Sequence, residues 1–177
     1  MSGVQHVILT AIGPDHPGLV DEVTLFVAEC GGNLEDSRMV NLRGQFAMMM
    51  LVAAPADAVR RLRDGLGELQ AASGLHAEVQ IAAVGRPSPS AALPYKLSTW
   101  AMDHPGLMQS VAHLLGELGV NIESAESSLH PAPYTNAPLF EMELVLTVPQ
   151  STHVAELREA LGRLCDELNI DWHLTAL

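Results

Sequence analysis

Positive charge is scarce in this sequence. Among its 177 residues, 9 lysines and arginines stand against 21 aspartates and glutamates, so the formal net charge is −12 at pH 7, and Lys96 is the only lysine. Contacts between basic side chains and phosphates supply most of the affinity of a protein for nucleic acid, so such a chain is repelled by DNA. The sequence therefore predicts no direct binding to nucleic acid.

Long apolar runs and cysteines are scarce too. No apolar run approaches the roughly 18 residues that a membrane-spanning helix needs. The first residues, MSGVQHVILT, have neither a basic start nor a small-residue cleavage site, so we expect no secretory signal. The two cysteines, Cys30 and Cys165, lie far apart in helix-like stretches, which is typical of a reduced, cytoplasmic protein. Hydrophobic residues make up 48% of the chain, which is enough for a core.

Residue sets typical of an enzyme or a metal site are missing as well. His16 and His104 each follow an aspartate directly, but adjacent residues do not form a base and its orienting group, and no serine elbow accompanies them. Three histidines of the second half are spaced too widely for a zinc site: His130, His153 and His173. We expect no catalytic residue, no metal and no cofactor.

A repeat dominates what is present. The pentapeptide DHPGL occurs at residues 15–19 and again at 103–107, which is an offset of 88 (103 − 15). Asn33 and Asn121 keep this offset, and the sequence between pentapeptide and asparagine aligns without a gap. The chain is therefore predicted to contain two copies of one small domain.

The later part of each copy shifts the alignment. FAMMMLVAAP (46–55) matches FEMELVLTVP (140–149) at an offset of 94 (140 − 46), so the second copy has gained six residues (94 − 88) around 130–135. Between the copies, GRPSPSAALP has three prolines in ten residues, which is typical of a semi-rigid linker. We predict an N-terminal domain over 1–84, a linker over 85–94 and a C-terminal domain over 95–177.

Each copy shows the order β-α-β-β-α-β. A β-branched or alternating run precedes the DHPGL turn, apolar residues at helical spacing follow it, and glycines end that helix. Two hairpins are predicted, 33–42 with 45–54 and 121–130 with 138–148, each followed by a helix and a strand. This order predicts an α+β, ferredoxin-like fold with both helices on one face of an antiparallel sheet. The other face must be covered, so we expect the copies to pack together or the chain to form an oligomer.

The DHPGL motif lies where the first strand turns into the first helix. Asp15 or His16 can cap the helix, and Pro17 suits its first turn. The N–H groups of Gly18 and Leu19 then point at an open position, which the helix dipole makes favourable for a small carboxylate. The second copy offers the same groups, on Asp103, His104, Gly106 and Leu107.

Asn33 and Asn121 begin the next strand of each copy, which we expect to lie near the first helix. An amide has both a donor and an acceptor, which suits a zwitterion, so the pattern predicts a site for a free amino acid. In the alternative interpretation the motif is only a strand-to-helix turn and the asparagines are turn residues without a ligand.

The motif and the strand order resemble the ACT domain, a small regulatory module that binds amino acids. The tandem arrangement, with GPDHPGL (13–19), CGGNLEDSRMVNLRGQF (30–46) and APYTNAPLFEMELVLTVP (132–149), resembles the family of glycine cleavage system transcriptional repressors over essentially the whole chain. The resemblance implies ligands near the Pro-Gly turn and at domain interfaces. It also implies a regulator that holds a DNA-binding activator protein, with glycine or serine as the effector.

Two classes of function stay open at this point. The first is a regulator that responds to an amino acid and binds another protein. The second is a structural or assembly module that keeps the fold, senses nothing and uses its exposed sheet face or edge for pairing. Binding of an amino acid separates the two.

Overall fold

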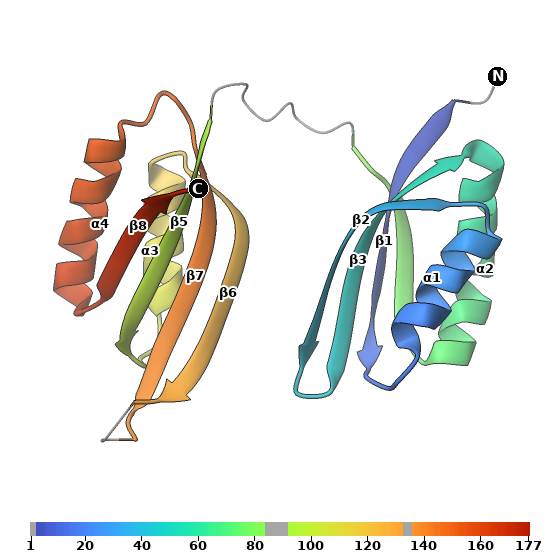
Figure 1. The fold of residues 1–177 in the computed structure, drawn as a ribbon, viewed down its shortest axis with the longest axis horizontal. Coiled ribbons are helices and arrows are strands. Elements are labelled where there is room, and N and C mark those ends of the chain that lie inside the picture. Colours follow the sequence, from blue (N-terminus) through green and yellow to red (C-terminus); the bar gives the residue numbers. More distant parts are fainter. Residues whose placement is uncertain (1–2, 84–91, 133–135) are drawn as a thin grey trace. The chain divides into compact units, whose positions relative to one another are not determined.

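The computed structural model describes residues 3–83, 92–132 and 136–177, and the chain divides into two compact units, Met1–Gly85 and Arg86–Leu177 (Figure 1). Most of the predicted linker and the last three residues of the predicted insertion, 133–135, lie outside the described residues. The strand that opens the second unit begins at Leu93, within the range assigned to the linker.

The first unit has the order β-α-β-β-α-β. Its elements are β1 (Val4–Pro14), α1 (Leu19–Glu29), β2 (Asn33–Leu42), β3 (Gln45–Pro55), α2 (Ala56–Ser73) and β4 (His76–Ile81). The strands form one antiparallel sheet in the order β2-β3-β1-β4, and both helices cover the same face of it (Figure 1).

The second unit repeats this arrangement. Its elements are β5 (Leu93–Met102), α3 (Leu107–Glu117), β6 (Asn121–Pro131), β7 (Pro138–Val148), α4 (Val154–Leu168) and β8 (Asp171–Ala176). The sheet order β6-β7-β5-β8 is the order of the first unit, element for element. The predicted α+β architecture of two tandem ferredoxin-like domains is therefore confirmed.

Each unit has its own core between sheet and helices. Alternate side chains of the two central strands point inward, so that Leu9 on β1 and Met50 on β3 are fully buried, as are Leu97 and Leu144 in the second unit. The helices contribute apolar residues at helical spacing, including Val23, Leu62, Val111 and Leu161. Because each core is complete in itself, the duplication in the sequence corresponds to two separately packed folds.

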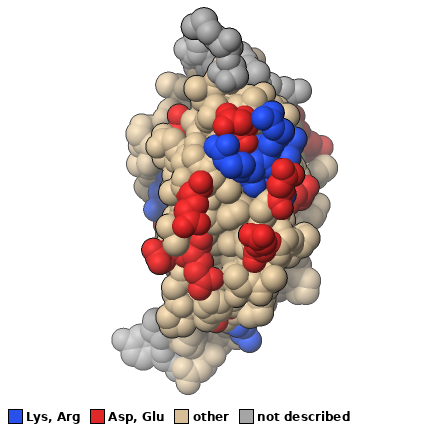
Figure 2. All heavy atoms as spheres, turned by 90° about the vertical axis from the view of Figure 1, so that its right-hand side faces the viewer, with Lys and Arg blue, Asp and Glu red and all other residues tan. Residues whose placement is uncertain are grey.

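The outer faces of the helices are charged, as expected for solvated surfaces. Arg60, Arg61 and Arg63 on α2 are exposed, and Arg61 donates to Asp57 at 2.8 Å. In Figure 2 basic side chains gather in a small cluster bordered by acidic ones. Among the described residues, no helix is long and apolar enough to cross a membrane.

A bulge recurs at the start of each hairpin. The register of β2 against β3 shifts between Leu34 and Asp36, and that of β6 against β7 shifts between Ile122 and Ser124. Each bulge leaves a glutamate without an opposite residue, Glu35 in the first unit and Glu123 in the second, at the repeat offset of 88 (123 − 35).

Candidate functional site

The DHPGL turn ends a strand and begins a helix in both units, as predicted, but its capping was predicted wrongly. Gly18 is the N-cap of α1 and no side chain caps the helix, so neither Asp15 nor His16 does so, and Pro17 precedes the cap. Gly18 has φ +99°, in the left-handed region. Glycine is favoured here because other side chains are strained in that conformation.

Asp15 instead forms hydrogen bonds that hold the turn against the tip of the β2–β3 hairpin. Its N–H donates to the carbonyl of Gly44 at 2.9 Å, and the amide of Asn41 donates to its carboxylate at 2.5 Å. Sequence reasoning missed Asn41. The signal was present in the NLRG turn that ends β2, where Arg43 and Gly44 both have positive φ.

His16 fastens the same turn to the end of α2. Its Nδ1 lies 3.1 Å from the carbonyl oxygen of Pro17, and its Nε2 lies 3.3 Å from that of Ser73. The Pro17 contact and, after it, the Ser73 contact raise the pKa of His16, because only the protonated ring donates to both carbonyls. In the second unit His104 Nδ1 lies 3.2 Å from the Pro105 carbonyl oxygen, and its Nε2 has no partner among the described residues.

The second copy of the turn has the same backbone. Gly106 has φ +97° and is the N-cap of α3, and the N–H of Asp103 donates to the carbonyl of Pro138 at 2.9 Å. Within the described residues, the N–H groups of Gly18, Leu19, Gly106 and Leu107 have no hydrogen-bond acceptor. Each turn therefore presents free donors at the positive end of a helix.

The two helix N-termini differ in charge. The first turn of α1 carries Asp21 and Glu22, whereas that of α3 carries no acidic residue, because Gln109 and Ser110 occupy the corresponding positions. These two acidic side chains already interact with the positive end of the α1 dipole and would repel a further carboxylate. The start of α3 is consequently the better place for an added carboxylate.

Asn33 and Asn121 lie away from these turns within their own units. Asn33 pairs with Ala53, which pairs with His6 near the start of β1, whereas Gly13, next to the turn, pairs with Phe46. The 11 residues of α1, about 16 Å of helix, separate Gly18 from the end of the sheet that holds Asn33. The strand therefore begins near the first helix, as expected, but at its C-terminal end rather than at the DHPGL turn.

In the second unit Asn121 is also engaged already. Its amide donates to Glu123 at 2.7 Å, and the hydroxyl of Thr147 donates to the same carboxylate at 2.8 Å. The Thr147 and Asn121 hydrogen bonds lower the pKa of Glu123. Within one unit, a ligand the size of glycine cannot touch both the turn and the asparagine.

Other reactive groups do not gather into a centre. Within the described ranges, no three histidine, cysteine or acidic side chains are placed to share a metal ion. Cys165 is fully buried, and burial raises the pKa of its thiol to about 11, so the thiol stays protonated. Cys30 is half-buried, and burial is also the main cause that raises its pKa.

Comparisons with known proteins agree with the fold. The ACT domain family matches residues 5–80. The glycine cleavage system transcriptional repressor of Escherichia coli (strain K12) is 30% identical over 173 residues, which cover 96% of this chain and 88% of that protein. A crystal structure of an unknown protein from Galdieria sulphuraria is 27% identical, with a TM-score of 0.85 over 99% of each chain. The chain therefore belongs to the ACT domain family, as a protein with two such domains that resembles the glycine cleavage system transcriptional repressor over its full length.

Proposed function

We propose that this protein is a cytoplasmic, non-enzymatic regulator that binds a small amino acid and acts through contact with a DNA-binding activator protein. The observation that carries the proposal is the similarity to a transcriptional repressor across 96% of the chain. The charge of −12 agrees with it, because so acidic a chain needs another protein to act at DNA.

The effector, glycine or serine by resemblance, docks its carboxylate on the N–H groups that follow Pro17 or Pro105. The start of α3 is favoured, because no acidic side chain in its first turn repels the ligand. Of the predicted residues, Gly106 and Leu107 therefore contribute backbone donors, while Asp103 and His104 shape the turn.

Reciprocal variants test this site by calorimetry with glycine and serine. Gln109→Asp with Ser110→Glu gives α3 the first turn of α1, and two charges at a helix start should weaken carboxylate binding about three- to thirtyfold. Asp21→Gln with Glu22→Ser is the matched exchange in α1 and should leave binding at α3 unchanged. Acetate serves as the ligand control, since it has the carboxylate without the amino group.

The outcomes separate the two functional classes. If no amino acid binds at millimolar concentration, the turn is only structural and the chain is a non-sensing assembly module. If amino acids bind but the α3 exchange has no effect, the carboxylate lies elsewhere. If Asn33→Ala or Asn121→Ala weakens binding about tenfold or more, as the loss of a hydrogen bond to a charged group would, the asparagine contacts the ligand, and the ligand does not bind at the turn of the same unit.

A further inference from the structure

The face of the first sheet opposite α1 and α2 is apolar at its centre. Alternate residues of β1 and β3 point to this open face: Ile8, Thr10, Ile12, Ala47, Met49 and Leu51. Ile12 is 54% exposed and Met49 is 53% exposed, although both are large apolar side chains on inner strands of the sheet. A shallow groove over Met49 and Ile12 continues this face to β2.

The second unit carries acidic side chains at the corresponding positions, where the first unit carries apolar ones. Glu141 and Glu143 of β7 stand where Ala47 and Met49 stand in β3, at the offset of 94. Both face the open side, where Glu141 accepts from the indole of Trp100 at 3.0 Å and Glu143 pairs with Lys96 at 2.6 Å. The fold itself therefore does not require an apolar open face.

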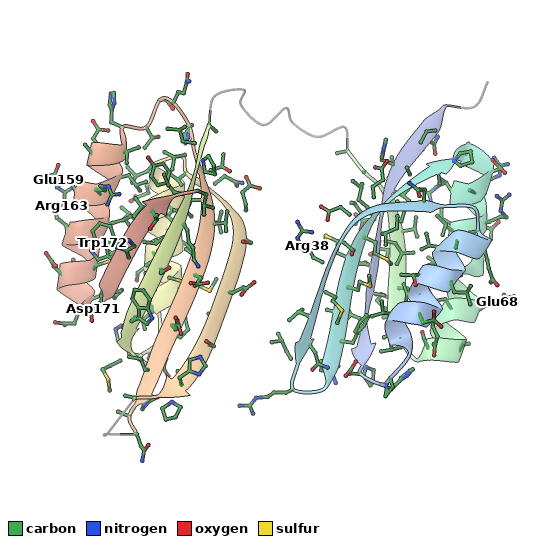
Figure 3. The ribbon with its side chains drawn as sticks, viewed as in Figure 1. Arg38, Glu68, Glu159, Arg163, Asp171 and Trp172 are labelled. Atoms are coloured by element: carbon green, nitrogen blue, oxygen red, sulfur yellow. The ribbon has the colours of Figure 1, made fainter. Side chains whose placement is uncertain are left out.

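Charges on the first sheet are arranged in a row across the strands. Arg38 of β2 pairs with Met49, Met49 with Thr10, and Thr10 with Glu78 of β4, so the four side chains share the open face. The row has a positive end on one edge strand and a negative end on the other. The side chain of Arg38 is 80% exposed and extends away from α1 and α2 (Figure 3), and its exposed pair with Asp36 contributes little energy.

The neighbouring rows follow the same plan. One consists of Asp36, Leu51, Ile8 and Gln80, and the other of Val40, Ala47, Ile12 and His76. In both rows the two central residues are apolar, and the edge residues are polar except for Val40.

We propose that this face binds the same face of a second copy of the chain, about a two-fold axis parallel to the strands. This axis places each row over the same row of the partner with the order of the strands reversed. Arg38 then lies opposite the partner subunit's Glu78, and Glu78 lies opposite the partner subunit's Arg38. Leu51 then packs on the partner's Ile8, and Ala47 on the partner's Ile12. Two sheets that pack face to face lie about 10 Å apart, a spacing that long side chains bridge.

The other face-to-face arrangement is disfavoured by charge. A two-fold axis perpendicular to the strands that passes over this row places each strand over its own copy, so that Arg38 lies over the partner subunit's Arg38 and Glu78 over the partner subunit's Glu78. The second unit is also a poor self-binding surface, because its open face carries Glu126, Glu141, Glu143 and Asp171 with Lys96 as its one lysine. Two such faces repel each other.

The area is sufficient for a specific interface. A sheet of four strands is about 19 Å wide, and eight residues of strand are about 27 Å long, so each face covers on the order of 500 Å². Two faces together bury about 1,000 Å², the lower bound for a specific protein interface.

Sedimentation velocity of the full chain tests the proposal. At micromolar concentration the wild type, with a chain mass of 18.9 kDa, should sediment as a dimer. Met49→Asp places a carboxylate at the centre of each face and should raise the dissociation constant roughly a hundredfold or more. Met49 is exposed, so this change leaves the core intact, and circular dichroism verifies the fold.

A charge exchange tests the direction of the axis. Arg38→Glu alone and Glu78→Arg alone should each weaken the dimer roughly tenfold or more, and the double variant should restore it. Arg63→Glu is the matched control, because it makes the same charge change at an exposed position of α2 and should leave the dimer intact.

Three results would overturn the proposal. These are a monomeric wild type at all concentrations, a Met49→Asp protein that dimerises as strongly as the wild type, and a double charge variant no better than the single ones. None of them depends on whether an amino acid binds at the turns.

Discussion

At the scale of single residues, His16 links the stability of the first unit to pH. It is tied to Ser73, 57 positions later in the chain, and to Pro17. Asp15 and Glu22 lie close enough to raise its pKa further, by smaller amounts. The fold therefore binds a proton here more tightly than the unfolded chain does.

We predict that the first unit loses stability as the pH rises through the raised pKa of His16. The contribution is fully present below the ordinary histidine pKa of about 6.5, where both states are protonated, and disappears above the folded value. Thermal unfolding at several pH values should show this loss in the wild type and a smaller one in His16→Gln. His104→Gln is the matched control, and an equal change in that variant would contradict the assignment.

Gly18 allows a second prediction at this scale. A Cβ there would have open space, its nearest neighbour being a carboxylate oxygen of Glu22 at 3.8 Å, so any penalty comes from φ alone. We expect Gly18→Ala to lower the free energy of unfolding by about 1–2 kcal/mol, and Gly18→Asn by less, because asparagine tolerates left-handed backbone. Urea titration measures both values. Equal stability of glycine and alanine would show that φ is negative in solution.

At the scale of elements, the close contact between α1 and α2 depends on a glycine. A Cβ on Gly65 of α2 would lie 2.8 Å from the ring of Phe26 on α1, so the ring would have to move. Gly67, two residues later, has nothing within 4 Å of a Cβ. The two glycines therefore separate the effect of packing from the effect of helix propensity.

We predict that Gly67→Ala raises the free energy of unfolding by about 0.5–1 kcal/mol, because alanine loses less backbone entropy in a helix. Gly65→Ala should be about 1–3 kcal/mol less stable than Gly67→Ala, since displacement of Phe26 disturbs the packing. Chemical denaturation of both variants measures the difference. A Gly65→Ala protein as stable as Gly67→Ala would mean that the ring of Phe26 moves aside at no cost.

At the scale of the whole molecule, the net charge of −12 opposes direct binding to DNA. The first unit carries 10 acidic and 5 basic side chains and the second 11 and 4, so both halves are net negative. We predict that the purified chain does not shift duplex DNA at physiological salt, because it offers few phosphate contacts. Electrophoretic mobility shift checks this. Salt-dependent binding in the sub-micromolar range would contradict it.

Much of the architecture followed from the sequence alone. The ungapped repeat, the helical spacing after each DHPGL and the glycines at the helix ends are local signals, and they predicted the strand bounds 33–42 and 121–130 to within one residue. Such signals act within a turn or a hairpin, where neighbours in sequence are neighbours in space. For the candidate site, the sequence predicted the turn with its free N–H groups together with the two asparagines, but not the partners that hold the turn in place.

The remainder of the site was decided by tertiary structure. The register of strands far apart in sequence decides which end of the sheet holds Asn33 and which side chains reach the turn. The bonds from Asn41 to Asp15 and from His16 to Ser73 are of this kind. The sequence by itself determined two copies of one fold. Only the pairing of four strands placed Arg38, Met49, Thr10 and Glu78 in one row, because register decides which residues share a face.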